Sequence, residues 1–187
     1  MIKTIFAITE RCVACHSCEI ACSIEHSVSK TLFGAAYEQP KIRSRMKVQS
    51  VGGYSYPLNC NHCENASCMN ACPTGAMRRH PEMNSVYVAT DTCIGCWMCV
   101  MACPFGAVTA DHISKTALKC DRCPERVENG IEPACVDACP TKALIFDTSE
   151  GFVALKQQPT ANQAVGINNN AQTPATVAVW RNLKGTS

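Results

Sequence analysis

The 187-residue sequence contains no long hydrophobic run. No apolar stretch approaches the roughly 20 residues of a membrane-spanning helix, so we expect no membrane span. Residues Met1 to Ile8 are too short an apolar run for a secretion signal, and neither a small-residue cleavage site nor a twin arginine follows. These absences predict a cytoplasmic chain, which would reach the inner face of a membrane only through a partner.

Signatures of several other functions are also absent. The formal net charge is only +2, without the strongly basic footprint of a nucleic-acid-binding protein. The sequence has no glycine-rich dinucleotide loop, no Ser/His/Asp set and no open metal position for chemistry on a substrate. We therefore expect neither nucleic-acid binding nor catalysis by this chain alone.

Cysteine, in contrast, is abundant, with 16 residues in 187. In a short secreted chain, this density would indicate a disulfide scaffold. In a cytoplasmic chain, metal binding is the better interpretation. Metal-bound cysteines are thiolates, so the loaded protein should be more acidic than its formal charge indicates.

The segment from Cys93 to Pro104 has the spacing C-x2-C-x2-C-x3-C-P. This is the bacterial ferredoxin run, in which three cysteines hold one iron–sulfur cluster and the fourth holds a second. The fourth cysteine lies about one helical turn beyond the third and so reaches past the first cluster to a second one. Pro104 then ends that turn. A run of this kind predicts clusters in pairs.

Three more cysteine groups accompany this one. The first has the same spacing without the final proline, so we expect a longer helix after it. The fourth contains an eleven-residue insert, Pro124 to Ala134, which we expect to be a solvent loop. In sequence order the groups are Cys12, Cys15, Cys18 and Cys22; Cys60, Cys63, Cys68 and Cys72; Cys93, Cys96, Cys99 and Cys103; and Cys120, Cys123, Cys135 and Cys139.

The cross-ligation rule predicts which cysteines share a cluster. The second and third groups are close in sequence and should pair, so the first and fourth must pair across the chain. All sixteen cysteines are then used in four [4Fe–4S] clusters. The predicted ligands are Cys12, Cys15, Cys18 and Cys139 (set 1); Cys22, Cys120, Cys123 and Cys135 (set 2); Cys60, Cys63, Cys68 and Cys103 (set 3); and Cys72, Cys93, Cys96 and Cys99 (set 4).

The predicted fold class is α+β: two dicluster-ferredoxin-like modules with short strands, short helices and a core dominated by clusters. We expect this double domain over residues 1–150. Residues 151–187 are expected to form a polar low-complexity tail that is disordered or bound to a partner. Alternating basic residues from Lys41 to Lys47 predict a strand with one basic face. Such a strand is either a charge-protected edge or a docking face for an acidic partner.

The order and gaps of the four groups resemble those of four-cluster iron–sulfur electron-transfer subunits. That family includes the beta subunits of molybdopterin enzymes such as formate dehydrogenase and dimethyl-sulfoxide reductase. Within it, Glu25-His26-Ser27 with Ser29-Lys30, and Cys93 to Cys99, are most similar to the CO dehydrogenase iron–sulfur subunit. This resemblance implies a relay from nickel CO dehydrogenase to a hydrogenase or another acceptor. The alternative is the beta subunit of a molybdenum or tungsten enzyme such as formate dehydrogenase.

A remote alternative is a zinc-binding interaction module, because C-x2-C pairs also occur in zinc sites. Zinc sites do not need the ferredoxin run, and His16 and His62, which lie inside the motifs, are not required as ligands if four thiolates serve each cluster. Lys119, Arg122 and Lys142 lie near cysteines. They are either solvated side chains or charges that raise the cluster potentials.

Overall fold

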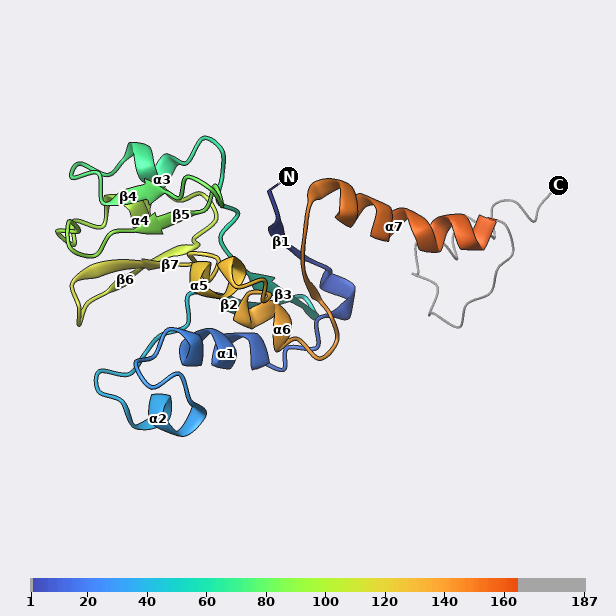
Figure 1. Cartoon of the computed structure of the whole chain (residues 1–187), viewed down its shortest axis with the longest axis horizontal. Helices are drawn as coiled ribbons and strands as arrows, with labels where there is room; N and C mark the ends of the chain where they lie inside the picture. Colours follow the sequence, from blue (N-terminus) through green and yellow to red (C-terminus); the bar gives the residue numbers. More distant parts are fainter. Residues whose placement is uncertain (1, 165–187) are drawn as a thin grey trace. The chain divides into compact units, whose positions relative to one another are not determined.

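The computed structural model describes residues 2–164 (Figure 1). The chain divides into two units, Met1–Asp147 and Thr148–Ser187, which are described separately. Every strand of the first unit belongs to a two-stranded antiparallel sheet. The sheets are β1 (Thr4–Ala7) with β8 (Leu144–Asp147), β2 (Lys47–Val51) with β3 (Tyr54–Leu58), β4 (Met77–Arg79) with β5 (Val86–Val88), and β6 (Val108–Asp111) with β7 (Thr116–Lys119).

The helices of the first unit are also short. They are the 3-10 helix η1 (Thr9–Arg11) and the α-helices α1 (Ser17–Glu25), α2 (Leu32–Tyr37), α3 (Ser67–Asn70), α4 (Met98–Ala102), α5 (Pro124–Glu128) and α6 (Ala134–Asp137). Short strands and short helices confirm the predicted α+β fold class. Helix α1 has nine residues and continues past Cys22, whereas α4 has five and ends before Cys103 and Pro104. The absence of a proline after Cys22 predicted this difference.

Strand pairing joins the two ends of the first unit. Ile5 on β1 lies opposite Phe146 on β8, and Ala7 lies opposite Leu144. Helix α1 packs against α6, so the first and fourth cysteine groups lie together although most of the unit separates them in sequence. Helix α3 packs against α4 in the same way, beside the β4–β5 hairpin (Figure 1). The first unit thus forms two modules, one from its ends and one from its middle.

Cysteine side chains form much of the buried core. In the terminal module, Cys18, Cys22, Cys135 and Cys139 are buried with few aliphatic residues, of which Leu144 is the most enclosed. In the middle module, the larger hydrophobic cluster consists of Ala66, Met77, Val86, Cys99, Val108 and Ala117. Because so little apolar surface is available, the groups bound by the thiols must supply part of the packing.

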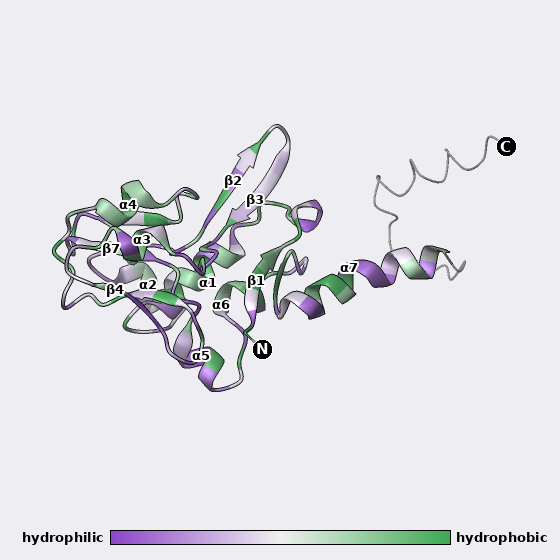
Figure 2. Cartoon of the chain, turned by 90° about the horizontal axis from the view of Figure 1, so that it is seen from above, coloured by the Kyte–Doolittle hydropathy of each residue, from purple (hydrophilic) through white to green (hydrophobic). Residues whose placement is uncertain are grey.

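Two predicted local structures differ from the observed ones. The expected strand from Lys41 is wrong, because β2 begins only at Lys47. Arg43 instead donates to the carbonyl oxygen of Ala110 (2.8 Å), and Arg45 donates to Asp121, so these side chains do not line one exposed face. Figure 2 shows β2 and β3 extending away from the rest of the first unit as a ribbon.

The second difference is the insert of the fourth group, which is not simply a solvent loop. It begins with α5, whose first residue is Pro124. Arg126 on this helix lies 3.3 Å from Glu25 on α1 and 2.9 Å from Asp137 at the end of α6. Lys30 pairs with both Glu25 and Glu125. These ion pairs hold the insert against the two helices of the terminal module.

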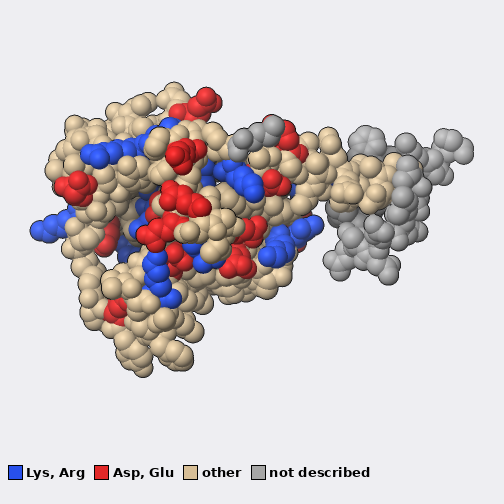
Figure 3. All heavy atoms as spheres, in the orientation of Figure 1, with Lys and Arg blue, Asp and Glu red and all other residues tan. Residues whose placement is uncertain are grey.

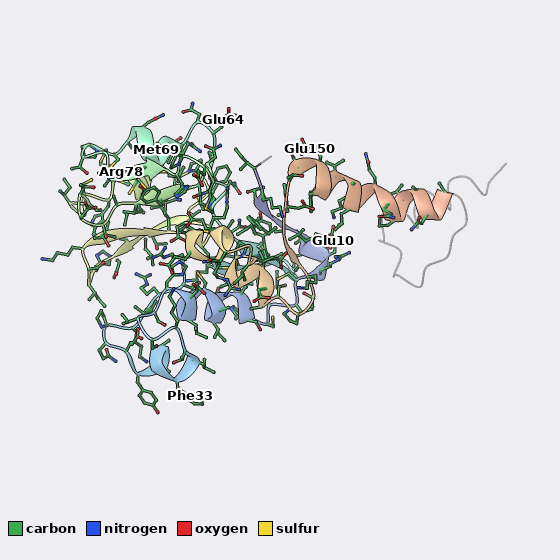
Figure 4. All side chains as sticks on the ribbon, viewed as in Figure 1. Glu10, Phe33, Glu64, Met69, Arg78 and Glu150 are labelled. Carbon is green, nitrogen blue, oxygen red and sulfur yellow. The ribbon has the colours of Figure 1, made fainter. Side chains whose placement is uncertain are left out.

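The surface of the first unit is mixed in character. On the face seen in Figure 3, basic and acidic side chains are intermixed, and neither sign covers the unit. Phe33 on α2 is 78% exposed and points away from the unit (Figure 4). None of the helices in residues 2–164 combines the length and the hydropathy of a membrane-spanning segment.

The described part of the second unit is helix α7 (Ser149–Ala164). The Thr148 hydroxyl accepts the N–H of Gly151 (3.1 Å), which satisfies one of the free donors at the start of the helix. Residues 151–164 of the expected tail lie within this helix. The remaining tail, 165–187, lies outside the described residues.

Candidate iron–sulfur sites

The same backbone conformation recurs in the C-x2-C loop of every group. The residue before the second cysteine has a positive φ in each case: 54° at Ala14, 48° at His62, 66° at Gly95 and 73° at Arg122. In a residue other than glycine, this conformation costs about 1 kcal/mol. Successive backbone N–H groups in such turns form concave anion-binding nests, which are common around iron–sulfur sites. Four equivalent nests thus precede the helices and turns that carry the later cysteines.

The structure brings together cysteines of the first and fourth groups. Burial, with a smaller contribution from nearby Cys139, raises the pKa of the Cys18 thiol to about 11. Burial also raises the pKa of Cys135 well above its ordinary value, and the neighbouring thiols of Cys120, Cys22 and Cys123 add to the shift. Cys18 and Cys139 belong to set 1, and the other four cysteines are the whole of set 2.

Cysteines of the second and third groups also lie together. Burial raises the pKa of Cys68, and Cys60 and Cys103, its neighbours in set 3, contribute in the same direction. Burial raises the pKa of Cys99 to about 11, and Cys93 and Cys72 of set 4 add to the shift. A single cavity is lined by all four cysteines of set 4, together with Met77, Val88, Trp97 and Ala117.

The remaining predicted ligands lie on the C-x2-C loops. Cys12 packs against the core of the terminal module. Cys63 is half-buried, whereas Cys15 and Cys96 are exposed. All sixteen cysteines are free thiols. The donor set is therefore sulfur throughout, as iron–sulfur clusters require.

Hydrogen-bond donors surround the last cysteine of the second and fourth groups, each of which is followed by a proline. At Cys139, burial acts to raise the pKa, but the N–H groups of Leu144 and Ala143 and the hydroxyl of Thr141 outweigh it and lower the pKa. The Ala143 N–H lies 3.2 Å from Cys139 Sγ. At Cys72, the backbone N–H of Met77 and the hydroxyl of Thr74 likewise outweigh the effect of burial and lower the pKa. These donors stabilise the thiolate form that a metal ligand needs.

The spacing of the sulfur atoms argues against zinc. Four sulfurs around one zinc ion lie about 3.8 Å apart, given Zn–S bonds of about 2.3 Å. Among the described residues, the one set of three Cys, His, Asp or Glu ligand atoms within 4.8 Å of one another is His26, Asp121 and Cys123. The four predicted cysteine sets, all within residues 2–164, are less compact than that. Wider spacing fits a cluster of several atoms.

The two histidines inside the motifs have other roles. His16 is exposed and lies 3.3 Å from Glu19. His62 is buried and accepts the N–H of Val86 at Nδ1 (2.9 Å), which leaves its proton on Nε2. Burial, reinforced by the charges of Lys119 and Arg122, lowers the pKa of His62 to about 2. Its Nε2 has no hydrogen-bond partner among the described residues.

Comparison with known proteins agrees with this geometry. Residues 51–149 match the family model for a 4Fe-4S dicluster domain, and residues 9–31 match that for a 4Fe-4S binding domain. Over 166 residues the sequence is 40% identical to an "Iron-sulfur protein" of Rhodospirillum rubrum, with 82% of this chain and 86% of that protein covered. It is 38% identical over 146 residues to the B subunit of the anaerobic dimethyl sulfoxide reductase of Escherichia coli, with 75% and 71% covered.

A solved structure, the "Active site complex BamBC of Benzoyl Coenzyme A reductase in complex with Benzoyl-CoA", contains a similar polypeptide. The sequence identity is 22% and the TM-score is 0.42, over 85% of this chain and 89% of that one.

Proposed function

Because this protein belongs to the 4Fe-4S dicluster family, whose relatives described above include an electron-transfer subunit of an oxidoreductase, we propose that it relays electrons for a molybdenum or tungsten enzyme. It binds [4Fe–4S] clusters and serves an oxidoreductase complex as an electron carrier rather than as the catalytic subunit. Beyond this general role, we propose four clusters, their cysteine ligands and the kind of partner enzyme.

The observation that carries the proposal is the order in which the cysteine sets neighbour one another. Cys135 of set 2 lies in the same buried hydrophobic cluster as Cys18 of set 1. Cys120 of set 2 lies in the same buried hydrophobic cluster as Cys60 of set 3. Cys68 of set 3 packs against the hydrophobic cluster that contains Cys99 of set 4. The sets therefore follow one another as 1, 2, 3 and 4, which supports a single path through the unit.

Sets 1 to 4 are the ligands that we propose for four clusters. Three of the sets are supported by neighbouring thiols that shift one another's pKa: Cys139 acts on Cys18 in set 1, the other three members act on Cys135 in set 2, and Cys60 and Cys103 act on Cys68 in set 3. Set 4 is supported by the cavity that its four cysteines line. When bound, each cluster supplies a one-electron carrier whose potential depends on hydrogen bonds, burial and nearby charge. The protein holds the thiolates and donates N–H groups to them, and it buries eight of the sixteen cysteines and leaves only two exposed.

Two kinds of partner enzyme are candidates. The relative named as a subunit of a dimethyl sulfoxide reductase supports the molybdenum or tungsten interpretation. A nickel CO dehydrogenase, with a hydrogenase or another acceptor, is the second candidate. It is favoured by the resemblance at Glu25-His26-Ser27 and Cys93 to Cys99, but neither of the two relatives described above is named for it. The proposal therefore places the molybdenum or tungsten enzyme first.

The test is the metal content of the complex that co-purifies anaerobically with this chain from its native cells. Molybdenum or tungsten, with about sixteen iron and sixteen sulfide per chain, is expected. Nickel instead would replace the first candidate by the second, and bleaching of the visible absorbance by CO would then separate CO dehydrogenase from a hydrogenase alone. Zinc without sulfide would overturn the relay itself.

A further inference from the structure

Two buried cations flank Cys120. Lys119 and Arg122 are each only 3% exposed. The ammonium group of Lys119 donates to the carbonyl oxygens of Val86 and Cys120, the latter at 2.8 Å. Arg122 donates to the carbonyl oxygen of Met83 (2.9 Å) and to the hydroxyl of Thr4 (3.3 Å). All four of these acceptors are neutral.

Neither cation has a carboxylate partner among the described residues, whose ion pairs all involve other basic groups. The nearby carboxylate of Asp121 is bound by Arg45 and His26 instead. Lysine and arginine are rarely buried without a counter-charge, because losing water costs a charged group several kcal/mol. Two such groups therefore require negative charge close by.

The groups around them that become negative when a cluster binds are cysteine sulfurs of the two middle sets, because metal-bound cysteines are thiolates. Arg122 interacts with Cys120 of set 2 and Cys60 of set 3. Lys119 interacts with Cys120 and with Cys68 of set 3. The cations thus lie where sets 2 and 3 meet.

We propose that Lys119 and Arg122 are positioning residues that raise the potentials of the two middle clusters above those of the end clusters. This inference rests on the proposed function and its ligand sets. Each one-electron reduction adds one negative charge beside the two cations, and no bond forms or breaks. At low dielectric the attraction favours the reduced state, so electrons should collect in the middle of the relay.

Lys142 provides a matched control, because it lies three positions after Cys139 of set 1 but is exposed. Water and salt screen its charge. The experiment compares Lys119→Gln, Arg122→Gln and Lys142→Gln in the full-length, cluster-loaded protein. Redox titrations followed by electron paramagnetic resonance give the four midpoint potentials. Iron and sulfide contents are measured on the same samples.

Lys119→Gln is expected to lower the potentials of two clusters and to leave the other two unchanged. Arg122→Gln should affect the same two clusters, and Lys142→Gln none. Lys119→Arg, which keeps the charge, should retain the wild-type values. Glutamine can still donate to a carbonyl oxygen, so a purely structural role for Lys119 predicts wild-type potentials in Lys119→Gln. That outcome, or an equal shift of all four clusters, overturns the inference.

The wild-type protein supplies a second test if the neutral variants fail to fold. Its two clusters of highest potential must be those whose signals change in Cys60→Ser and Cys120→Ser. If they are instead those affected by Cys12→Ser and Cys93→Ser, the inference is wrong. A protein that carries no clusters at all would refute the proposed function, which keeps the two failures distinct.

Discussion

Arg45 donates a hydrogen bond to the Asp121 carboxylate across 76 positions of the sequence. The other oxygen of Asp121 lies 3.2 Å from Nε2 of His26, and the backbone N–H of Arg45 lies 3.3 Å from Cys22 Sγ. Although burial acts to raise it, the hydrogen bond from His26 and the charge of Arg45 hold the pKa of Asp121 well below its usual range. One carboxylate therefore ties the first cysteine group to the fourth.

Asp121→Asn should destabilise the terminal module. The substitution leaves Arg45 and His26 partly buried without their counter-charge, and losing one partner of such a pair costs roughly 2–4 kcal/mol. For a protein of this size, the melting temperature should fall by roughly 4–16 °C. The measurement is anaerobic thermal unfolding of the loaded protein, followed by circular dichroism and visible absorbance.

Asp137→Asn is the control for that experiment. Asp137 also pairs with an arginine, Arg126, but its side chain is 64% exposed. An exposed pair is worth about 0–1 kcal/mol, so the melting temperature should change little. Equal losses in the two variants would contradict the role that we assign to Asp121.

Gly95→Ala should disrupt the loop that carries Cys93 and Cys96. Gly95 has φ of 66°, and a Cβ atom there would collide with the carbonyl oxygen of Lys115, which belongs to the backbone and cannot rotate away. The expected cost is roughly 1–3 kcal/mol. Iron release from the cluster of set 4 should accelerate, measured by transfer to a chelator under anaerobic conditions.

The matched variant is Ala14→Gly, at the equivalent position of the first group. Ala14 already has a Cβ at φ of 54°, so glycine relieves a conformational cost of about 1 kcal/mol instead of adding one. Iron release from the cluster of set 1 should not accelerate. If both variants release iron faster, loop flexibility rather than the collision explains the effect.

Sequence reasoning reached the fold and the candidate ligands because cysteine spacing is constrained by the size of a cluster. The absence of proline after Cys22 predicted the longer α1, and the ferredoxin run from Cys93 to Pro104 predicted clusters in pairs. Periodicity failed at Lys41 to Lys47, where Arg43 and Arg45 are fixed by tertiary contacts with Ala110 and Asp121 instead of by strand pairing. The alternation of charged and apolar residues is the same whether the segment is held by strand pairing or by tertiary contacts of its side chains, so it cannot distinguish the two.

The sequence also did not predict which of the charged side chains are buried. Lys119, Arg122 and Lys142 all lie near cysteines, yet the first two are buried and the third is exposed. The hydrogen-bonded pair of His26 and Asp121 beside Cys22 was also not predicted, because the sequence does not show which side chains meet in the fold. The only signal in the sequence was the Glu25-His26-Ser27 stretch, which also carries part of the family resemblance. The contacts of Asp121 with His26 and of Lys119 with Val86 join segments far apart in the sequence, which local patterns do not report.

The assignment of Cys22 to set 2 gives the sharpest prediction about the ligands. Cys22 belongs to the first group in sequence, but it neighbours Cys120, Cys123 and Cys135 of the fourth. Cys22→Ser should therefore change the same cluster signal as Cys120→Ser. Each of these two variants should lose up to about four of the sixteen iron atoms. Iron analysis and electron paramagnetic resonance of the reduced proteins provide the measurement.

Cys18→Ser separates cross-ligation from the simpler arrangement in which each group binds its own cluster. Cys18 is one turn before Cys22 on α1, but it neighbours Cys139. Residues four positions apart lie along one face of a helix, about 6 Å apart in rise, so two clusters can be held side by side there. Cross-ligation requires Cys18→Ser and Cys22→Ser to alter different clusters. If they alter the same one, the four sets must be redrawn as the four sequence groups, and the path from set 1 to set 4 loses its support.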